Sequence, residues 1–254
     1  MNLYFLGTGT SQGIPVIGSN HSVCLSTNQK DKRLRVSVKI SWEDYVFIID
    51  CGPDFRQQML ASNCQKVDGI LFTHEHSDHT AGLDDIRPFN FRQGSLPIFA
   101  HQRVINNLKK RFDYIFEVAN RYPGAPSVQT VEVLNNTPFA IGNKNATPIN
   151  VMHGNLQVFG YRIDDFAYLT DVKTIEDSEI NKLKGLKVLV VNALREEPHA
   201  THFNLKEALD FIQLIQPQKT YLTHISHILG FHDEVQQKLP ENVFLAYDNL
   251  QITI

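Results

Sequence analysis

The chain has 254 residues, 42% of them hydrophobic and 20% charged, which is enough for a sizeable core and typical of a globular protein. Its 24 basic and 27 acidic residues give a formal net charge of −3, which excludes a general electrostatic attraction to nucleic acid or anionic lipid. We expect no membrane span, because the apolar runs are far shorter than the ~18 residues of a spanning helix. We expect a cytoplasmic protein, because no signal peptide is evident and three cysteines without a CxxC pair do not indicate a disulfide framework.

Strand-like runs, rich in β-branched and aromatic residues, dominate the first part of the chain, and strand–helix alternation follows. Strands are expected at 2–6, 35–41, 45–50, 69–73, 146–152, 157–163, 166–170, 187–192, 219–223, 243–246 and 250–254. Helices are expected at 101–112, 174–184 and 204–215. The last two begin with N-cap patterns, Thr174 and Asn204 each with an acidic residue three positions later. This order indicates a layered α/β or α+β fold, in one domain over residues 1–254.

Four metal-ligand side chains follow the strand at 69–73, in the segment "THEHSDHT". His74 and His76 are two residues apart, so at an extended strand end they point the same way. Asp78 and His79 are expected at the turn into a helix that begins near Thr80. Imidazole and carboxylate groups suit a borderline dication such as Zn²⁺, and this density of ligands is improbable for a chance polar loop.

Three more ligand-type residues each close an apolar run further along the chain. His153 ends "TPINVMHG", Asp171 ends the strand in "FAYLTDV", and His224 ends the strand in "KTYLTHISH". Each residue alone is most simply an ordinary loop residue. Because strand ends on one rim of a sheet place functional groups together, the combination favours a metal centre at that rim.

On these residues the sequence resembles the metallo-β-lactamase superfamily over nearly the whole chain. The resemblance implies a four-layer αβ/βα sandwich with a dinuclear site at its edge, loaded with Zn²⁺ or Mn²⁺. It implies one metal on His74, His76 and His153, a second on Asp78, His79 and His224, and Asp171 as the bridge. It also implies that Asp50, in Asp50-Cys51-Gly52, orients the histidine loop.

The implied reaction is hydrolysis of a phosphodiester. An Asp bridge is typical of superfamily members that cleave phosphodiesters or thioesters, whereas those that open β-lactams typically carry Cys. The start "LGTGTSQGIPVIG" is similar to the RNase Z and phosphoribosyl cyclic phosphodiesterase branches, and "THISH" with "FLAYDNLQI" is closest to the latter. We therefore expect a small cyclic phosphate, such as phosphoribosyl 1,2-cyclic phosphate, to be attacked by a hydroxide that bridges the metals.

His202 is the expected catalytic histidine, beside Asp78 at the metals. It lies in "HATHFNLKEAL", just before a helix, where its position resembles the catalytic histidine of both phosphodiesterase branches. It would stabilise the transition state or protonate the leaving sugar oxygen. His199, three residues earlier, is the rival candidate.

The sequence departs from the cyclic phosphodiesterase pattern at a structural zinc site. That branch often holds zinc through three cysteines and the second His of "THxSH". The matching positions here are Ser19, His21, Cys24 and His227, so two sulfurs are lost. The hypotheses are a weakened third zinc site on His21, Cys24 and His227, or a hydrogen-bonded remnant.

Residues 84–126 are expected to cap the active site, with four arginines among aromatic residues. Arg87, Arg92, Arg111 and Arg121 are each more simply exposed helix charges than phosphate ligands, so none is assigned a role.

Three alternative functions remain open: an RNase Z-like tRNA 3′-endonuclease, a glyoxalase II-type thioester hydrolase, and a non-catalytic metal-binding or regulatory protein. The absence of a basic arm disfavours the first, the strand-like carboxyl-terminal runs disfavour the second, and the intact ligand set disfavours the third. The expected partner is a small-molecule phosphodiester rather than nucleic acid or membrane. The resemblance favours a homodimer.

Overall fold

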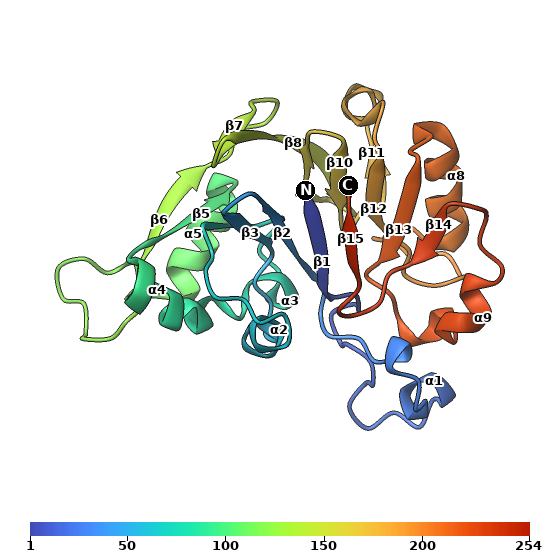
Figure 1. Cartoon of the computed structure of the whole chain (residues 1–254), viewed down its shortest axis with the longest axis horizontal. Helices are drawn as coiled ribbons and strands as arrows, with labels where there is room; N and C mark the ends of the chain where they lie inside the picture. The colour runs from blue at the N-terminus through green and yellow to red at the C-terminus, as the bar shows by residue number, and fades with distance from the viewer.

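Two mixed β-sheets face each other in the computed structural model, which describes residues 1–254 (Figure 1). The first sheet has the order β15-β1-β2-β3-β4-β5-β6. Its strands are β1 (Asn2–Gly7), β2 (Ser37–Trp42), β3 (Tyr45–Ile49), β4 (Gly69–Leu71), β5 (Leu96–Ala100), β6 (Val128–Glu132) and β15 (Gln251–Thr253). The first and last strands of the chain pair side by side, so both termini lie at the same place in the molecule.

The second sheet has the order β11-β8-β9-β10-β12-β13-β14, and β7 pairs with β8. Its strands are β7 (Phe139–Ile141), β8 (Lys144–His153), β9 (Leu156–Ile163), β10 (Phe166–Leu169), β11 (Thr174–Ile175), β12 (Val188–Asn192), β13 (Lys219–Thr223) and β14 (Val243–Leu245).

Helices cover the outer face of each sheet. The α-helices are α1 (Ser22–Leu25), α2 (Phe55–Ala61), α3 (Ser77–Thr80), α4 (Arg87–Gln93), α5 (Gln102–Arg111), α6 (Asp113–Phe116), α7 (Asp177–Ile180), α8 (Leu205–Ile215) and α9 (His232–Gln236). Short 3₁₀ turns are η1 (Gln29–Asp31), η2 (Leu83–Ile86), η3 (Asn181–Leu183) and η4 (His227–Leu229). None of these helices has the length and apolarity required to cross a membrane.

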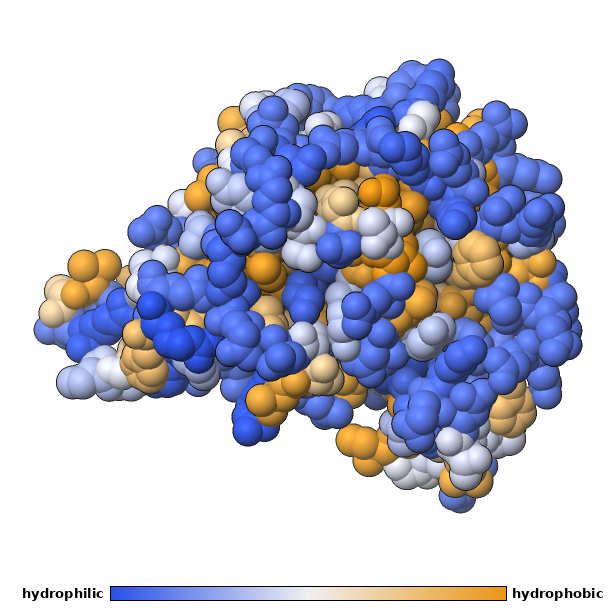
Figure 2. Space-filling model, viewed as in Figure 1, coloured by the Kyte–Doolittle hydropathy of each residue, from blue (hydrophilic) through white to orange (hydrophobic).

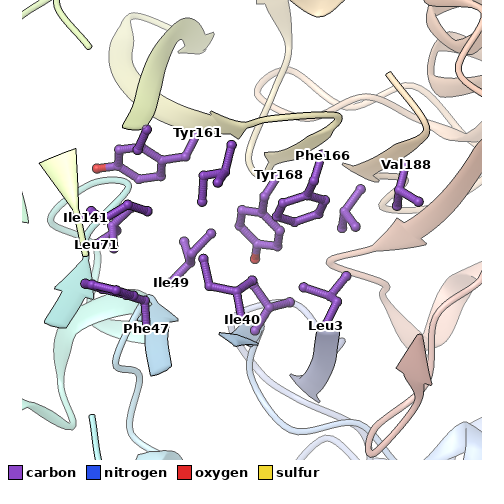
Figure 3. Packing of buried hydrophobic residues seen from close by; sticks show 14 of the residues in the cluster. Leu3, Ile40, Phe47, Ile49, Leu71, Ile141, Tyr161, Phe166, Tyr168 and Val188 are labelled. Atoms are coloured by element: carbon purple, nitrogen blue, oxygen red, sulfur yellow. The ribbon is translucent and has the colours of Figure 1, made fainter. Parts of the chain in front are cut away.

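Three large apolar clusters separate the layers. One fills the space between the two sheets, where Leu3 and Ile40 of the first sheet meet Phe166 and Tyr168 of the second (Figure 3). A second cluster lies between the first sheet and its helices, and a third between the second sheet and α8 and α9. Three interlayer cores define four layers, so the predicted αβ/βα sandwich is confirmed.

Parallel strands bring the expected functional residues to one edge. Strand β3 runs parallel to β4, and β4 to β5. In the other sheet β10, β12 and β13 are mutually parallel, and β8 has the same direction because β9 lies antiparallel between β8 and β10. Since the carboxyl ends of parallel strands share an edge, the loops that follow them converge there.

All eleven predicted strands and two of the three predicted helices match the structure within about two residues. The prediction of a helix over 174–184 is wrong at its start. Thr174 pairs with Met152 in the short strand β11 instead of capping a helix, and α7 begins at Asp177. A helix was expected to begin near Thr80, but α3 ends at Thr80 and contains Asp78 and His79.

Residues 84–126, the segment expected to cap the active site, are largely built into the first sheet and the helices that cover it. They supply η2, α4, α5 and α6 and the strand β5, which lies between β4 and β6 inside the first sheet. Within this segment, the loop between α6 and β6 projects from the body at the left of Figure 1, and Figure 2 shows apolar residues at its end. Val118 in this loop is almost fully exposed.

A buried charged network joins the amino-terminal loop to the carboxyl-terminal strands. Arg33 Nη1 donates to Thr8 Oγ1 (2.7 Å) and to the carbonyl of Ala246 (2.5 Å). Its Nη2 lies 3.2 Å from Nδ1 of buried His232. Because a guanidinium can only donate, His232 accepts at Nδ1 and is neutral. Burial, and then Arg33, lower the pKa of His232 to about 4.

The free energy of unfolding should therefore fall as the pH drops from about 6.5 to about 4, because the unfolded chain binds a proton at His232 that the folded chain excludes. In His232→Gln, which keeps an acceptor for Arg33 but does not titrate, we expect this loss to be about 1 to 2 kcal/mol smaller. Urea denaturation of chelator-treated protein across this range is the measurement. Parallel pH profiles for the two proteins would refute the assignment.

Candidate metal centre

Three histidine rings face one another after β4. The ring centroids of His74 and His76 are 4.6 Å apart, and those of His74 and His79 are 4.2 Å apart. His76 is the N-cap of α3, which carries Asp78 and His79 in its single turn. The Oδ2 atom of Asp78 lies 3.2 Å from Nε2 of His79. The segment thus presents four ligand-type side chains on a few adjacent residues.

Asp50, which follows β3, orients the histidine segment through contacts with Thr73 and His79. Its carboxylate accepts hydrogen bonds from the backbone N–H and the hydroxyl of Thr73, both at 2.8 Å. It also lies 2.7 Å from Nδ1 of His79. Since a carboxylate accepts, Nδ1 of His79 carries the proton and Nε2 is left for a metal. The sequence did not predict this role of Thr73 as a hydrogen-bond donor to Asp50. The only signal in the sequence was its position directly before His74.

Gly52 allows the Asp50 turn to approach the histidine loop. A side chain at Gly52 would place its Cβ only 2.1 Å from the carbonyl oxygen of Asp78. The two segments are joined by hydrogen bonds from Cys51 N to His79 O (2.8 Å) and from Gly82 N to Cys51 O (2.9 Å). This close backbone contact accounts for the glycine in Asp50-Cys51-Gly52.

Asp171 lies at the centre of the site, two residues beyond the end of β10. Its Oδ2 is 3.2 Å from Nε2 of His79 and 3.4 Å from Nε2 of His224. Its Oδ1 is 3.9 Å from Nε2 of His153 and 3.5 Å from Nδ1 of His202. One carboxylate therefore faces histidines from both sheets, the geometry that a bridging ligand requires.

His153 and His202 complete the far side of the centre. His153 ends β8, and its Nδ1 donates to the carbonyl of Thr201 at 2.7 Å, which leaves Nε2 for a metal. His202 lies in the loop between β12 and α8, with its ring 4.5 Å from that of His153 and 4.8 Å from that of His224. The half-buried His199 ring is 5.1 Å further out, against His202.

These donors fit divalent metal ions. His74, His79 and Asp171 form one group of ligand atoms that all lie within 4.8 Å of one another, and Asp78, His79 and His224 form a second. His153, Asp171 and His202 form a third, so His202 lies close enough to share a metal with His153 and Asp171. Nε2 of His79 and both ring nitrogens of His224 are buried and have no hydrogen-bond partner. A buried nitrogen without a partner is costly, and a coordinated metal would remove that cost.

The charges of the site support the same arrangement. Burial opposes ionisation of His79, but Asp78, Asp171 and Asp50 together raise its pKa well above the usual value. Burial would raise the pKa of Asp171, yet the surrounding histidines, His224 first, hold it well below its ordinary value. The centre therefore stabilises Asp171 as an anion beside positive charge, which is the state in which a carboxylate binds a dication.

Three residues that follow strands adopt left-handed backbone conformations. The φ angles are 65° at Asp50, 57° at Asp171 and 55° at His224. This conformation costs a non-glycine residue roughly 1 to 2 kcal/mol, although Asp and His tolerate it better than most. The sharp turn directs each side chain across the sheet edge toward the centre, so the strain accompanies the function.

The ligand atoms of the suggested third site, on His21, Cys24 and His227, are not grouped as closely as those of the main centre. The rings of His21 and His227 are 5.0 Å apart, and Cys24 is buried nearby on α1. His21 Nδ1 already accepts from Val23 N (3.3 Å), and Cys24 Sγ from Val16 N (3.5 Å). The three groups of ligand atoms that lie within 4.8 Å of one another all belong to the main centre.

Comparison with known proteins identifies relatives along the whole chain. The profile of a family described as a beta-lactamase superfamily domain matches residues 45–225. A crystal structure of a diphosphatase from the PhnP family superposes with a TM-score of 0.93 and 36% identity, over 100% of this chain and 97% of that one.

Two curated relatives differ in name. An octanoyltransferase of Porphyromonas gingivalis is 38% identical over 100% of this chain and 52% of its own length. A ribonuclease Z of Bacillus licheniformis is 29% identical over 73% of this chain and 55% of its own length. The chain thus spans about half the length of these two curated relatives.

Proposed function

Because the chain belongs to the metallo-β-lactamase superfamily of metal-dependent hydrolases, and within it to the PhnP family, we propose that it cleaves a small phosphodiester, most simply a cyclic sugar phosphate. The observation that carries this proposal is the donor set of the centre. Five imidazoles, which are neutral when they coordinate a metal, and only two carboxylates would hold the ions, so two bound dications would keep a net positive charge. A singly charged phosphate diester is complementary to such a site, whereas an uncharged thioester gains less from it.

Two divalent ions held by the seven ligand residues, Zn²⁺ in our proposal, would supply a water-derived nucleophile near neutral pH and neutralise phosphate oxygens. The protein's own contribution is orientation and proton control. Burial, and then His224, lower the pKa of His202 to about 3, so its imidazole is neutral and can donate one hydrogen bond. A bound phosphate anion would raise that pKa, and His202 could then protonate the leaving oxygen.

A substrate panel tests the proposal directly. Metal-reconstituted protein is assayed with a five-membered cyclic phosphate of ribose, linear diesters, pre-tRNA and acyl thioesters. We expect the highest kcat/KM on the cyclic phosphate and no turnover after removal of metal with a chelator. Turnover of thioesters alone would overturn the phosphodiester assignment.

Acyl thioester hydrolysis is the second candidate, favoured by the 38% identity to an octanoyltransferase. The match covers 52% of that protein, so the acyl transfer in its name can reside in the part without a counterpart here. The octanoyl thioester in the panel separates the two candidates.

A tRNA endonuclease activity is less well supported. The loop between α6 and β6 does project from the body and contains Pro123, Gly124 and Pro126. Its charged residues are Glu117 and Arg121, one of each sign, so it provides no basic surface for a polyanion.

Metal counting tests the suggested third site. We expect about two ions per chain, because His21 and Cys24 each already accept a backbone hydrogen bond. Elemental analysis after gel filtration is the measurement, and Cys24→Ser should leave the count unchanged. A third ion that is lost in Cys24→Ser would establish a site at His21, Cys24 and His227.

A further inference from the structure

Two arginines of α5, Arg103 and Arg111, form hydrogen bonds to the segment that carries His74, His76, Asp78 and His79. Arg103 forms a two-pronged pair with Glu75, with Nε 2.8 Å from Oε1 and Nη2 3.1 Å from Oε2. Glu75 lies between the ligands His74 and His76, and its side chain is only 16% exposed. A partly buried, bidentate guanidinium–carboxylate pair is stronger and more directional than an exposed one.

The same guanidinium also reaches the other sheet. Arg103 Nη2 donates to the carbonyl of Gln157 at 2.6 Å. Gln157 lies on β9 opposite Met152, next to the pair formed by His153 and Leu156. Arg103 therefore joins the segment that presents His74 and His76 to the hairpin that presents His153. These three histidines are the ligands expected for one metal ion.

Arg111, at the other end of α5, holds the rest of the segment. Its Nη1 donates to the carbonyl of Glu75 (3.0 Å) and to Thr80 Oγ1 (2.8 Å), and its Nη2 to Ser77 Oγ (3.1 Å). Residues 74–76 lie outside helices and strands, so no regular backbone ladder fixes them. Hydrogen bonds from arginine side chains hold this segment in place instead. Because Arg111 donates to Glu75, Ser77 and Thr80, its guanidinium is not free to bind substrate.

We propose that Arg103 and Arg111 are positioning residues that set the spacing of the three-histidine metal site, with Arg103 acting through Glu75 and the β8–β9 hairpin. The inference deepens the proposed function and rests on its metal pair. Neither arginine touches the reacting atoms; both act by holding the ligands at the separation a metal requires. Partners of this kind typically contribute 10- to 100-fold to metal affinity.

The test is a metal titration of chelator-treated protein, with Zn²⁺ in competition with a chromophoric chelator. In Arg103→Lys, which keeps the charge but loses the fork, the Kd of one of the two ions should rise about 10- to 100-fold. The matched control is Arg92→Lys on α4, whose guanidinium donates to the carbonyl of Gln65, outside any ligand segment. The Co²⁺ absorption spectrum should change in Arg103→Lys and not in the control.

Glu75→Gln provides a second variant should Arg103→Lys fail to fold. It should weaken the same ion, and the double variant should be no weaker than the worse single variant, because both changes break one pair. Metal affinity within twofold of the Arg92→Lys control in both single variants would overturn the proposal, as would additive losses in the double variant. The titration contains no substrate, so wild-type protein that binds two ions but cleaves no diester would refute the proposed function alone.

Discussion

Replacing Asp171 with asparagine is expected to lower kcat for diester cleavage by about 10³-fold or more and to reduce the metal content of the protein. The asparagine keeps the size of the side chain and one oxygen, but it removes the negative charge that faces His79 and His224 at 3.2 and 3.4 Å. Without that charge, the repulsion between two dications so close together would be less well screened.

Kinetics and elemental analysis on the same preparation measure both effects. Asp165→Asn is the matched control, because Asp165 lies next to the opposite end of β10, half-buried and paired with Lys187. That variant should retain its metal and its kcat. An Asp171→Asn enzyme with two ions and wild-type kcat would show that Asp171 does not bridge the metals.

Replacing His202 with alanine should lower kcat by about 10²- to 10⁴-fold while both metals remain bound. His202 lies within reach of Asp171 and between the rings of His153 and His224, and the seven proposed ligands do not include it. The loss should appear in kcat rather than in KM if the imidazole acts mainly on the transition state.

The comparison variant is His199→Ala, at the rival position, whose ring lies outside that of His202. We expect a much smaller loss of kcat there. If His199→Ala loses activity and His202→Ala does not, the two roles must be exchanged. If neither variant changes kcat, then proton donation to the leaving oxygen does not involve this loop.

The candidate metal ligands could be proposed from the sequence because most of them follow an apolar strand, and the strand pattern can be read locally. Parallel strands then brought His153, Asp171 and His224 to the edge where His74 lies, which follows from topology alone. The left-handed backbone at Asp50, Asp171 and His224 could not be predicted in this way. It depends on turns imposed by the packed sheets, and Asp and His carry no local mark of it.

Other differences have local physical reasons. Strand β5 was missed because Pro97 in "LPIFA" is unusual within a sheet, yet it pairs with Gln129 between two parallel neighbours. Thr174 reads as a helix cap, but pairing with β8 overrides that preference. The bonds of Arg103 and Arg111 join segments far apart in sequence, so no spacing rule could have indicated them.

The pairing of β1 with β15 has a consequence for engineering. Asn2 lies opposite Thr253, so the two ends of the chain are adjacent. Strand β1 runs from there to Thr8, whose carbonyl accepts from Ile225, the residue after His224. The six residues of β1 thus separate the ends from the metal centre by roughly 20 Å. A short flexible linker that joined the present ends in a circular permutant would therefore lie far from the candidate metal ligands.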